Sequence, residues 1–235
     1  MTEPVPTDSG AADAPTGTAG PTATAGPTGS HYFHSPSDPL DLTKLREVDC
    51  EIWGEKLRFR TAAGVFSGTR LDPGTSVLFQ ESAPPTEALR IADIGCGFGP
   101  IAVALARKAR GARVDAVDVN ERALQLTRLN ADALGVGERV RVLRPTKADS
   151  EARYDQIWSN PPIRVGKAAL HELLLTWLPR LSDEGEARLV VGKNLGADSL
   201  QRWITEQQVD GRGFTCERAA SAKGFRVLSV RLWAL

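Results

Sequence analysis

The chain is poor in cysteine and histidine, and it has no long hydrophobic run. Its three cysteines (Cys50, Cys96 and Cys216) are scattered without a CxxC pair, and its three histidines do not complete a set of metal ligands. No stretch approaches the ~20 consecutive apolar residues of a membrane span. We therefore expect a protein of the reduced cytoplasm, with no metal and no membrane partner.

Net charge is also absent, because 29 basic residues balance 29 acidic ones. The acids include Glu3, Asp8 and Asp13, in a segment (residues 1–30) that has no Lys or Arg, so the rest of the chain carries a slight positive excess. Such an excess neither requires nor excludes a nucleic-acid partner, since phosphates are usually met by a local basic patch rather than by net charge.

Residues 1–30 also lack large aliphatic side chains, apart from Val5, and are built mostly from Thr, Ala, Gly and Pro. A segment of this composition cannot bury enough apolar surface to offset the entropy lost on ordering, so we expect a disordered tail. It has neither the basic start and apolar stretch of a signal peptide nor the arginine of a mitochondrial presequence. Since 41% of the 235 residues are hydrophobic, we expect residues 31–235 to form one domain.

Strand and helix patterns alternate along most of this domain. Apolar residues on both sides of Gly54 predict a β-hairpin, within an N-terminal extension at about residues 31–82. The strands expected after it cover residues 89–94, 113–117, 139–143, 154–158, 187–191, 214–218 and 226–232. The expected helices cover residues 101–110 and 121–134, a segment around 169–178, and a segment through 200 and 204. This order predicts an α/β fold, with a doubly wound, mostly parallel seven-stranded sheet of Rossmann-like type and an antiparallel end.

A glycine-rich run from Asp93 to Pro100 (DIGCGFGP) joins the first parallel strand to its helix. In open parallel sheets, ligands bind beyond the carboxyl ends of the strands, and Asp118 ends the next strand, where it can accept hydrogen bonds from ribose hydroxyls. The spacing GxGxG, rather than GxGxxG, is typical of sites for S-adenosylmethionine, which has no pyrophosphate to place on a helix N-terminus. The alternative is that the glycines only make a tight turn. For Cys96, a small residue that fills the loop is preferred to a redox role.

A second motif, Asn160-Pro161-Pro162, follows the fourth parallel strand. The side-chain carbonyl of Asn160 and the backbone carbonyl of Pro161 can both accept hydrogen bonds from one NH₂ group, while the prolines restrict the loop. A conjugated amine is a poor nucleophile, and two acceptors that favour a pyramidal nitrogen direct its lone pair toward a donor methyl for an in-line displacement. The alternative is a rigid loop without chemistry, since Pro84-Pro85 shows that paired prolines occur elsewhere in the chain.

Residues from about 31 to 235 resemble the class I methyltransferases of the small-domain kind, most closely the guanine-N2 methyltransferases of small-subunit ribosomal RNA. The stretches that carry the resemblance, besides the two motifs above, are Gly64–Ser67, Asp72–Thr75, Ile163–Lys167 and Lys223–Leu228. The resemblance implies that S-adenosylmethionine is the cofactor, and that ribosomal RNA or the small ribosomal subunit is the partner. The residues expected to bind the cofactor are Asp93, Gly95, Cys96, Gly97, Gly99, Asp118, Val119 and Asn120. The residues expected to carry catalysis are Asn160, Pro161 and Pro162, and those expected to contact the substrate are Phe66, Ile163, Arg164 and Lys167.

The sequence departs from the family pattern after Asn-Pro-Pro, where amine methyltransferases often have an aromatic residue that stacks on the base. Ile163 stands there, so Phe66 is a candidate for the stacking residue. Arg164 and Lys167 are expected to meet phosphates, and their alternative role is a solvated helix start. Other conjugated amines, namely adenine N6 or a protein glutamine amide, remain alternative acceptors. An inactive, RNA-binding assembly factor with this fold is another alternative, and a nicotinamide oxidoreductase is disfavoured by the glycine spacing.

Overall fold

The computed structural model describes Met1 and residues 40–65, 70–162 and 166–234. The expected disordered tail over residues 1–30 therefore lies outside the described residues, apart from Met1. Three of the expected substrate contacts, Phe66, Ile163 and Arg164, lie outside them too.

The main sheet contains eight strands of the described residues, in the order β5-β4-β3-β6-β7-β10-β9-β8. The strands are β1 (Arg46–Ile52) and β2 (Glu55–Thr61) in a separate hairpin, then β3 (Arg90–Ile94), β4 (Arg113–Val117), β5 (Val140–Leu143), β6 (Tyr154–Ser159), β7 (Leu181–Gly192), β8 (Gln208–Val209), β9 (Arg212–Ala222) and β10 (Phe225–Ala234). β5, β4, β3, β6 and β7 pair in parallel, whereas β10, β9 and β8 continue the sheet in antiparallel pairing. The doubly wound fold is confirmed, but the expected count of seven strands is corrected to eight by the two-residue β8.

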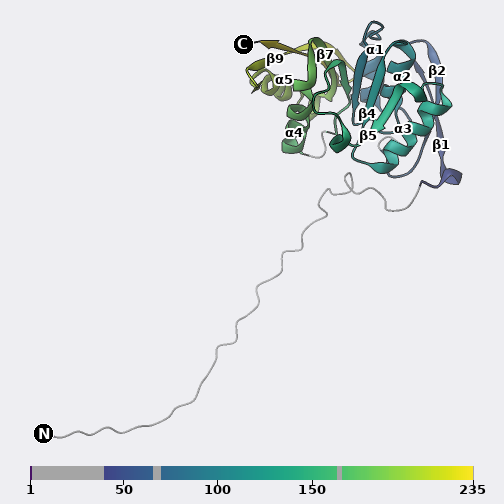
Figure 1. The fold of residues 1–235 in the computed structure, drawn as a ribbon, viewed down its shortest axis with the longest axis horizontal. Coiled ribbons are helices and arrows are strands. Elements are labelled where there is room, and N and C mark those ends of the chain that lie inside the picture. The colour runs from purple at the N-terminus through teal and green to yellow at the C-terminus, as the bar shows by residue number, and fades with distance from the viewer. Residues whose placement is uncertain (2–39, 66–69, 163–165, 235) are drawn as a thin grey trace.

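Helices cover both faces of this sheet (Figure 1). The α-helices of the described residues are α1 (Pro73–Gln80), α2 (Pro100–Lys108), α3 (Glu121–Ala133), α4 (Lys167–Trp177) and α5 (Ala197–Thr205). One hydrophobic cluster joins the sheet to α1, α2, α3 and the hairpin, and a second joins it to α4 and α5. The sequence predicts α2 to α5, while α1 is an addition that the structure reveals.

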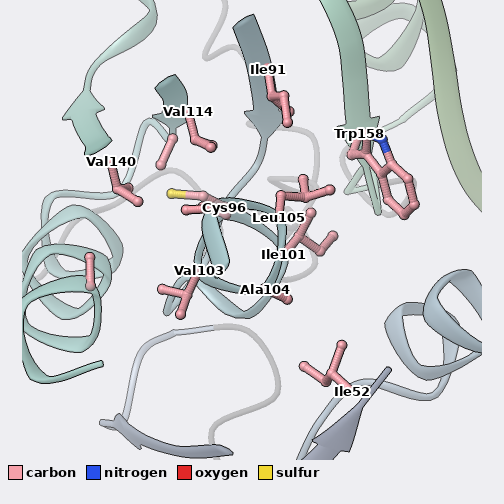
Figure 2. Close-up of a cluster of buried hydrophobic side chains, with 14 of the residues drawn as sticks. Ile52, Ile91, Cys96, Ile101, Val103, Ala104, Leu105, Val114, Val140 and Trp158 are labelled. Carbon is pink, nitrogen blue, oxygen red and sulfur yellow. The ribbon is translucent and has the colours of Figure 1, made fainter. Parts of the chain in front are cut away.

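The predicted hairpin is confirmed, and it is fastened to the rest of the domain by aromatic packing. Its turn residues Trp53 and Gly54 both have positive φ (48° and 77°), as a two-residue turn between twisted strands requires. The Trp53 ring meets Phe79 of α1 and Trp158 of β6 edge-on, at centroid distances of 5.0 and 5.8 Å. Figure 2 shows Ile52 of the hairpin and Trp158 among the side chains of this cluster. The hairpin thus supports the strand that ends just before Asn160.

Within the described residues, the helices are too short or too polar to cross a lipid bilayer.

Candidate functional site

Three predicted site residues, Asp93, Asp118 and Asn160, lie where the strand order of the sheet reverses. β3 lies between β4 and β6, and all three run in the same direction, so their carboxyl ends share one edge. Asp93 lies opposite Trp158 of β6, while Asp118 and Asn160 directly follow β4 and β6. A crevice at such a reversal is the usual ligand site of open α/β sheets.

The glycine turn between β3 and α2 is held by backbone hydrogen bonds to β4. The N–H groups of Gly95 and Cys96 both donate to the carbonyl of Val117, at 2.8 and 3.0 Å. Gly99 has a φ of +93°, and a Cβ built on it would lie 3.0 Å from Cγ2 of Thr127 in α3, so a side chain there would be strained. A Cβ at Gly97 would meet no atom of the described residues within 4 Å. The turn is therefore closed toward α3 and open on its other side, where a ligand can approach.

Cys96 belongs to the frame of this turn. Its sulfur lies 3.4 Å from Oγ1 of Thr127, and burial raises the pKa of its thiol well above the usual value. Figure 2 shows the side chain among the aliphatic residues of the core. The interpretation of Cys96 as a small residue that fills the loop agrees with this placement, since its side chain and its N–H both have partners within the protein.

Asp93 is fully buried beneath the turn. Its Oδ2 accepts a hydrogen bond from the N–H of Ala102 (2.9 Å), whereas Oδ1 has no partner among the described residues. Burial raises the pKa of Asp93 to about 8; the Ala102 hydrogen bond opposes this shift, and the charge of Asp118 adds to it. A ligand that places a positive charge near the turn would favour the ionised form of this carboxyl group.

Asp118 holds the turn and the start of α3 together. Its Oδ2 accepts from the N–H of Gly97 (3.0 Å) and its Oδ1 from the N–H of Asn120 (2.9 Å). Burial raises the pKa of Asp118, and these backbone hydrogen bonds act in the opposite direction. Each carboxylate oxygen can accept more than one hydrogen bond, so Asp118 can also accept hydrogen bonds from the hydroxyl groups of a ligand. Beside it, the side chain of Val119 is 44% exposed and offers an apolar surface.

Asn120 is occupied by contacts within the protein. Its Oδ1 accepts from the N–H of Arg122 as the N-cap of α3, and its Nδ2 donates to the carbonyl of Gly64 (3.0 Å). Arg122 also donates to the carbonyl of Ala63 (2.8 Å). These contacts anchor residues 63 and 64 to the start of α3, whose N-cap Asn120 lies two residues after Asp118.

The acceptor motif touches the glycine turn. A Cβ built on Gly95 would lie 3.9 Å from Cδ of Pro162, and Oγ of Ser159 donates to the carbonyl of Ile94 (2.6 Å). Pro161 is buried, whereas Asn160 is only half-buried. The two predicted motifs therefore lie side by side in the fold.

The side-chain amide of Asn160 has a defined orientation. Its Nδ2 donates to Oδ1 of Asp72 (2.6 Å) and lies 3.0 Å from Oγ1 of Thr75. No hydrogen bond from the described residues reaches its Oδ1. The carbonyl end of the amide is thus available to accept a hydrogen bond from a ligand.

The sequence alone predicts no role for Asp72 or Thr75, although both lie in a stretch that carries the family resemblance. Asp72 followed by Pro73 is the signal that could have located them, since an N-cap residue followed by proline marks a helix start. Lys167, the remaining expected substrate contact, is exposed as the first residue of α4. In the described part of the chain, no group of three or more His, Cys, Asp or Glu side chains is arranged to hold a metal ion.

The chain is similar to several known proteins. The family model of the methyltransferase small domain matches residues 56–229. The chain is 33% identical over 164 residues to the uncharacterised protein YbxB of Bacillus subtilis, which covers 66% of this chain and 81% of that protein. It is 33% identical over 158 residues to ribosomal RNA small subunit methyltransferase C of Escherichia coli, which covers 63% of this chain and 46% of the relative.

A solved structure has the same fold over most of the chain. It is the Thermus thermophilus 16S rRNA N2 G1207 methyltransferase in complex with AdoMet and guanosine, with a TM-score of 0.62 and 23% identity. The match covers 83% of this chain and 52% of that one. The chain therefore spans about half the length of the E. coli and T. thermophilus ribosomal RNA methyltransferases that it matches.

Proposed function

The chain belongs to the methyltransferase small domain family, and on that premise we propose that it methylates the exocyclic amine of a guanine in small-subunit ribosomal RNA. The observation that carries the proposal is the orientation of Asn160, whose NH₂ group is held by Asp72 while its carbonyl faces no partner among the described residues. That carbonyl lies on a loop in contact with the glycine turn. A carbonyl that can accept a hydrogen bond from an amine therefore adjoins the glycine turn, which fits the methyl donor.

The donor half fits S-adenosylmethionine, which supplies an electrophilic methyl group on a positively charged sulfur. Asp118 would accept hydrogen bonds from the ribose hydroxyls, and the exposed side chain of Val119 would lie against the adenine. The unpartnered Oδ1 of Asp93 would gain from the positive charge of the bound cofactor. The open side of Gly97 would leave room for it.

The acceptor half acts by positioning. The lone pair of a guanine N2 is delocalised into the ring, which makes the amine a weak nucleophile. The side-chain carbonyl of Asn160 and the backbone carbonyl of Pro161 would accept hydrogen bonds from the two N–H groups of the amine. They would thereby direct its lone pair toward the glycine turn. The alkylated nitrogen then becomes acidic, so no strong base is needed at this position.

The choice of small-subunit ribosomal RNA is supported by relatives. Methyltransferase C of E. coli is named for the small-subunit RNA, and the T. thermophilus structure holds guanosine. A duplex hides the guanine N2, so the target base must be unpaired or leave its stack to reach the site. Phe66 or Ile163 would cover the face of the base, and Arg164 and Lys167 would meet the flanking phosphates.

Methyl transfer from labelled S-adenosylmethionine to small ribosomal subunits and to naked ribosomal RNA, both from cells lacking the protein, tests the proposal. We expect label on a guanine, and mass mapping of the RNA should show the same guanine unmethylated in those cells. A methyl missing from an adenine or a protein glutamine would instead identify one of the alternative acceptors. RNA binding without donor binding would indicate an inactive assembly factor.

The contribution of the phosphate contacts needs its own variant and control. Replacing Arg164 and Lys167 by Ala should weaken RNA methylation and flatten its salt dependence while donor affinity stays unchanged. The matched control replaces Arg110 and Arg113, two exposed cationic residues at the opposite edge of the sheet, and should leave the salt dependence unchanged.

A further inference from the structure

We infer that Asp72 is a positioning residue that determines which end of the Asn160 amide meets the acceptor amine. The inference rests on the proposed function, because it concerns the same acceptor site. Asp72 lies 88 residues before Asn160 in the chain and is the N-cap of α1. Its carboxylate and the amide nitrogen of Asn160 are 2.6 Å apart.

The chemistry of the two partners of Asn160 explains why Asp72 sets the orientation. An ionised carboxylate can only accept hydrogen bonds, so the amide must turn its NH₂ end toward Asp72. The second partner, Oγ1 of Thr75, is a hydroxyl that can donate or accept, so it tolerates either orientation. If the Asn160 amide were reversed, its NH₂ group would face the substrate amine. An NH₂ group cannot accept a hydrogen bond from that amine.

Asp72 is itself held in place before any substrate arrives. Its Oδ1 also accepts the backbone N–H groups of Gly74 (2.8 Å) and Thr75 (3.1 Å), which are free donors in the first turn of α1. The negative charge is favourable at this helix end. A Cβ built on Gly74 would lie 2.9 Å from Oδ1 of Asp72 and 3.0 Å from the ring of Phe225, so a side chain there would disturb the contact.

This arrangement brings together three sequence stretches that carried the family resemblance. Asp72 to Thr75 begin α1, Asn160 follows β6, and Phe225 begins β10 against Gly74. Lys223 also donates to the side chain of Gln80 at the end of α1 (3.0 Å). The start of α1 therefore contacts Asn160, and the end of α1 is held by Lys223.

The variant Asp72→Asn tests the inference while preserving the helix cap, because Asn caps a helix about as well as Asp. An Asn side chain can offer either its oxygen or its NH₂ group to Asn160, so the orientation is no longer determined. We expect the turnover number to fall by about 10-fold or more, as for a lost hydrogen bond to a charged group, with donor affinity unchanged. The same loss should not occur in Asp155→Asn, whose carboxylate, at the start of β6, accepts the backbone N–H groups of Leu89 and Arg90.

A double variant separates positioning from a general structural effect. In the Asn160→Ala background, Asp72→Asn should cause no further loss of turnover, because Asp72 acts only through Asn160. An equal loss in both backgrounds, or normal turnover in the single variant, would overturn the inference. Label transfer to small ribosomal subunits is the assay for all of these proteins.

A second readout does not depend on the identity of the acceptor. The side-chain amide signal of Asn160 in the ¹⁵N NMR spectrum can be identified by its absence from Asn160→Ala, and it should show slow hydrogen exchange that Asp72→Asn abolishes. If Asp72→Asn left the hydrogen exchange of this amide unchanged, the inference would be refuted even if the wild-type protein methylated nothing. If the protein methylates adenine or a glutamine amide, the guanine proposal fails, but Asp72→Asn should still reduce that reaction.

Discussion

Removal of the Asp118 carboxylate gives the most direct measure of the donor half of the site. Asp118 is more than half-buried and its oxygens already organise the turn through Gly97 and Asn120. In Asp118→Ala, a ligand's ribose hydroxyls lose a charged acceptor, and such hydrogen bonds contribute about 1.5–3 kcal/mol. Since about 1.4 kcal/mol changes a dissociation constant tenfold, we expect binding of S-adenosylmethionine to weaken by about 10- to 100-fold.

Calorimetric titration with S-adenosylmethionine measures this effect, and Asp155→Ala is the matched control. Asp155 also accepts two backbone N–H groups, from Leu89 and Arg90 at 2.8 and 2.9 Å, but it lies at the start of β6, away from the site. Asp118→Asn keeps one acceptor oxygen and should show an intermediate loss. Unchanged affinity in Asp118→Ala, or an equal loss in Asp155→Ala, would remove Asp118 from the set of cofactor ligands.

Four further expectations follow from the described contacts and from the composition of the tail. Asn160→Ala should retain donor affinity in calorimetry and lose most label transfer; loss of donor binding would assign Asn160 another role. Because the folded-state pKa of Asp93 is raised from 3.8 to about 8, the folded state holds this proton more tightly, so the stability of the wild type relative to Asp93→Asn should fall as the pH rises through that window. Urea unfolding at several pH values measures the difference, and a pH-independent difference would contradict the assignment. Gly99→Ala should lower the free energy of unfolding by about 1–3 kcal/mol, because of its positive φ and its contact with Thr127, and an unchanged urea midpoint would contradict this. Deletion of residues 1–30 should leave the melting temperature and donor affinity unchanged, and a clear drop in either would show that the tail packs on the domain.

The elements that the sequence predicts well are those with a strong local pattern. β4 is predicted with its observed bounds, Arg113–Val117, and α3 differs from the expected helix by one residue. α1 is different, because Pro73, Gly74 and Thr75 are poor helix formers. It forms because Asp72 caps it and because the apolar residues of its second turn are buried against the sheet and the hairpin. Local propensity does not contain that tertiary contribution.

The antiparallel end of the sheet shows the same limit. β8 consists of only Gln208 and Val209, which pair with β9 at the edge of the sheet, and two residues carry no readable alternation. β7 begins at Leu181, several residues before the expected start. The sequence pattern misses this first part because it includes the exposed residues Asp183 and Glu184. Exposed strand residues need no apolar pattern, so pairing with a neighbour defines them rather than hydrophobicity.

The donor half could be predicted more fully than the acceptor half because its signal is contiguous. Asp93 and the glycines lie in one run, and Asp118 ends the next strand, so strand order alone brings them together. The partners of Asn160 lie 88 and 85 residues away, on a helix that the sequence does not predict. Likewise, Asn120 reaches Gly64 across 56 residues. Contacts of this range depend on the packing of α1, the hairpin and the sheet.

In the proposed function, the donor half and the acceptor half of the site are held by different parts of the fold, and this separation predicts different effects of changes in each half. The donor half is fixed by β3, β4 and α3, whereas the amide of Asn160 is fixed by the start of α1. Ser159 and Pro162 join the halves through Ile94 and Gly95. A small displacement of α1 would therefore reorient the acceptor oxygen without altering the donor turn. Changes at Asp72 should appear in turnover and changes at Asp118 in donor affinity, because each carboxylate organises only its own half.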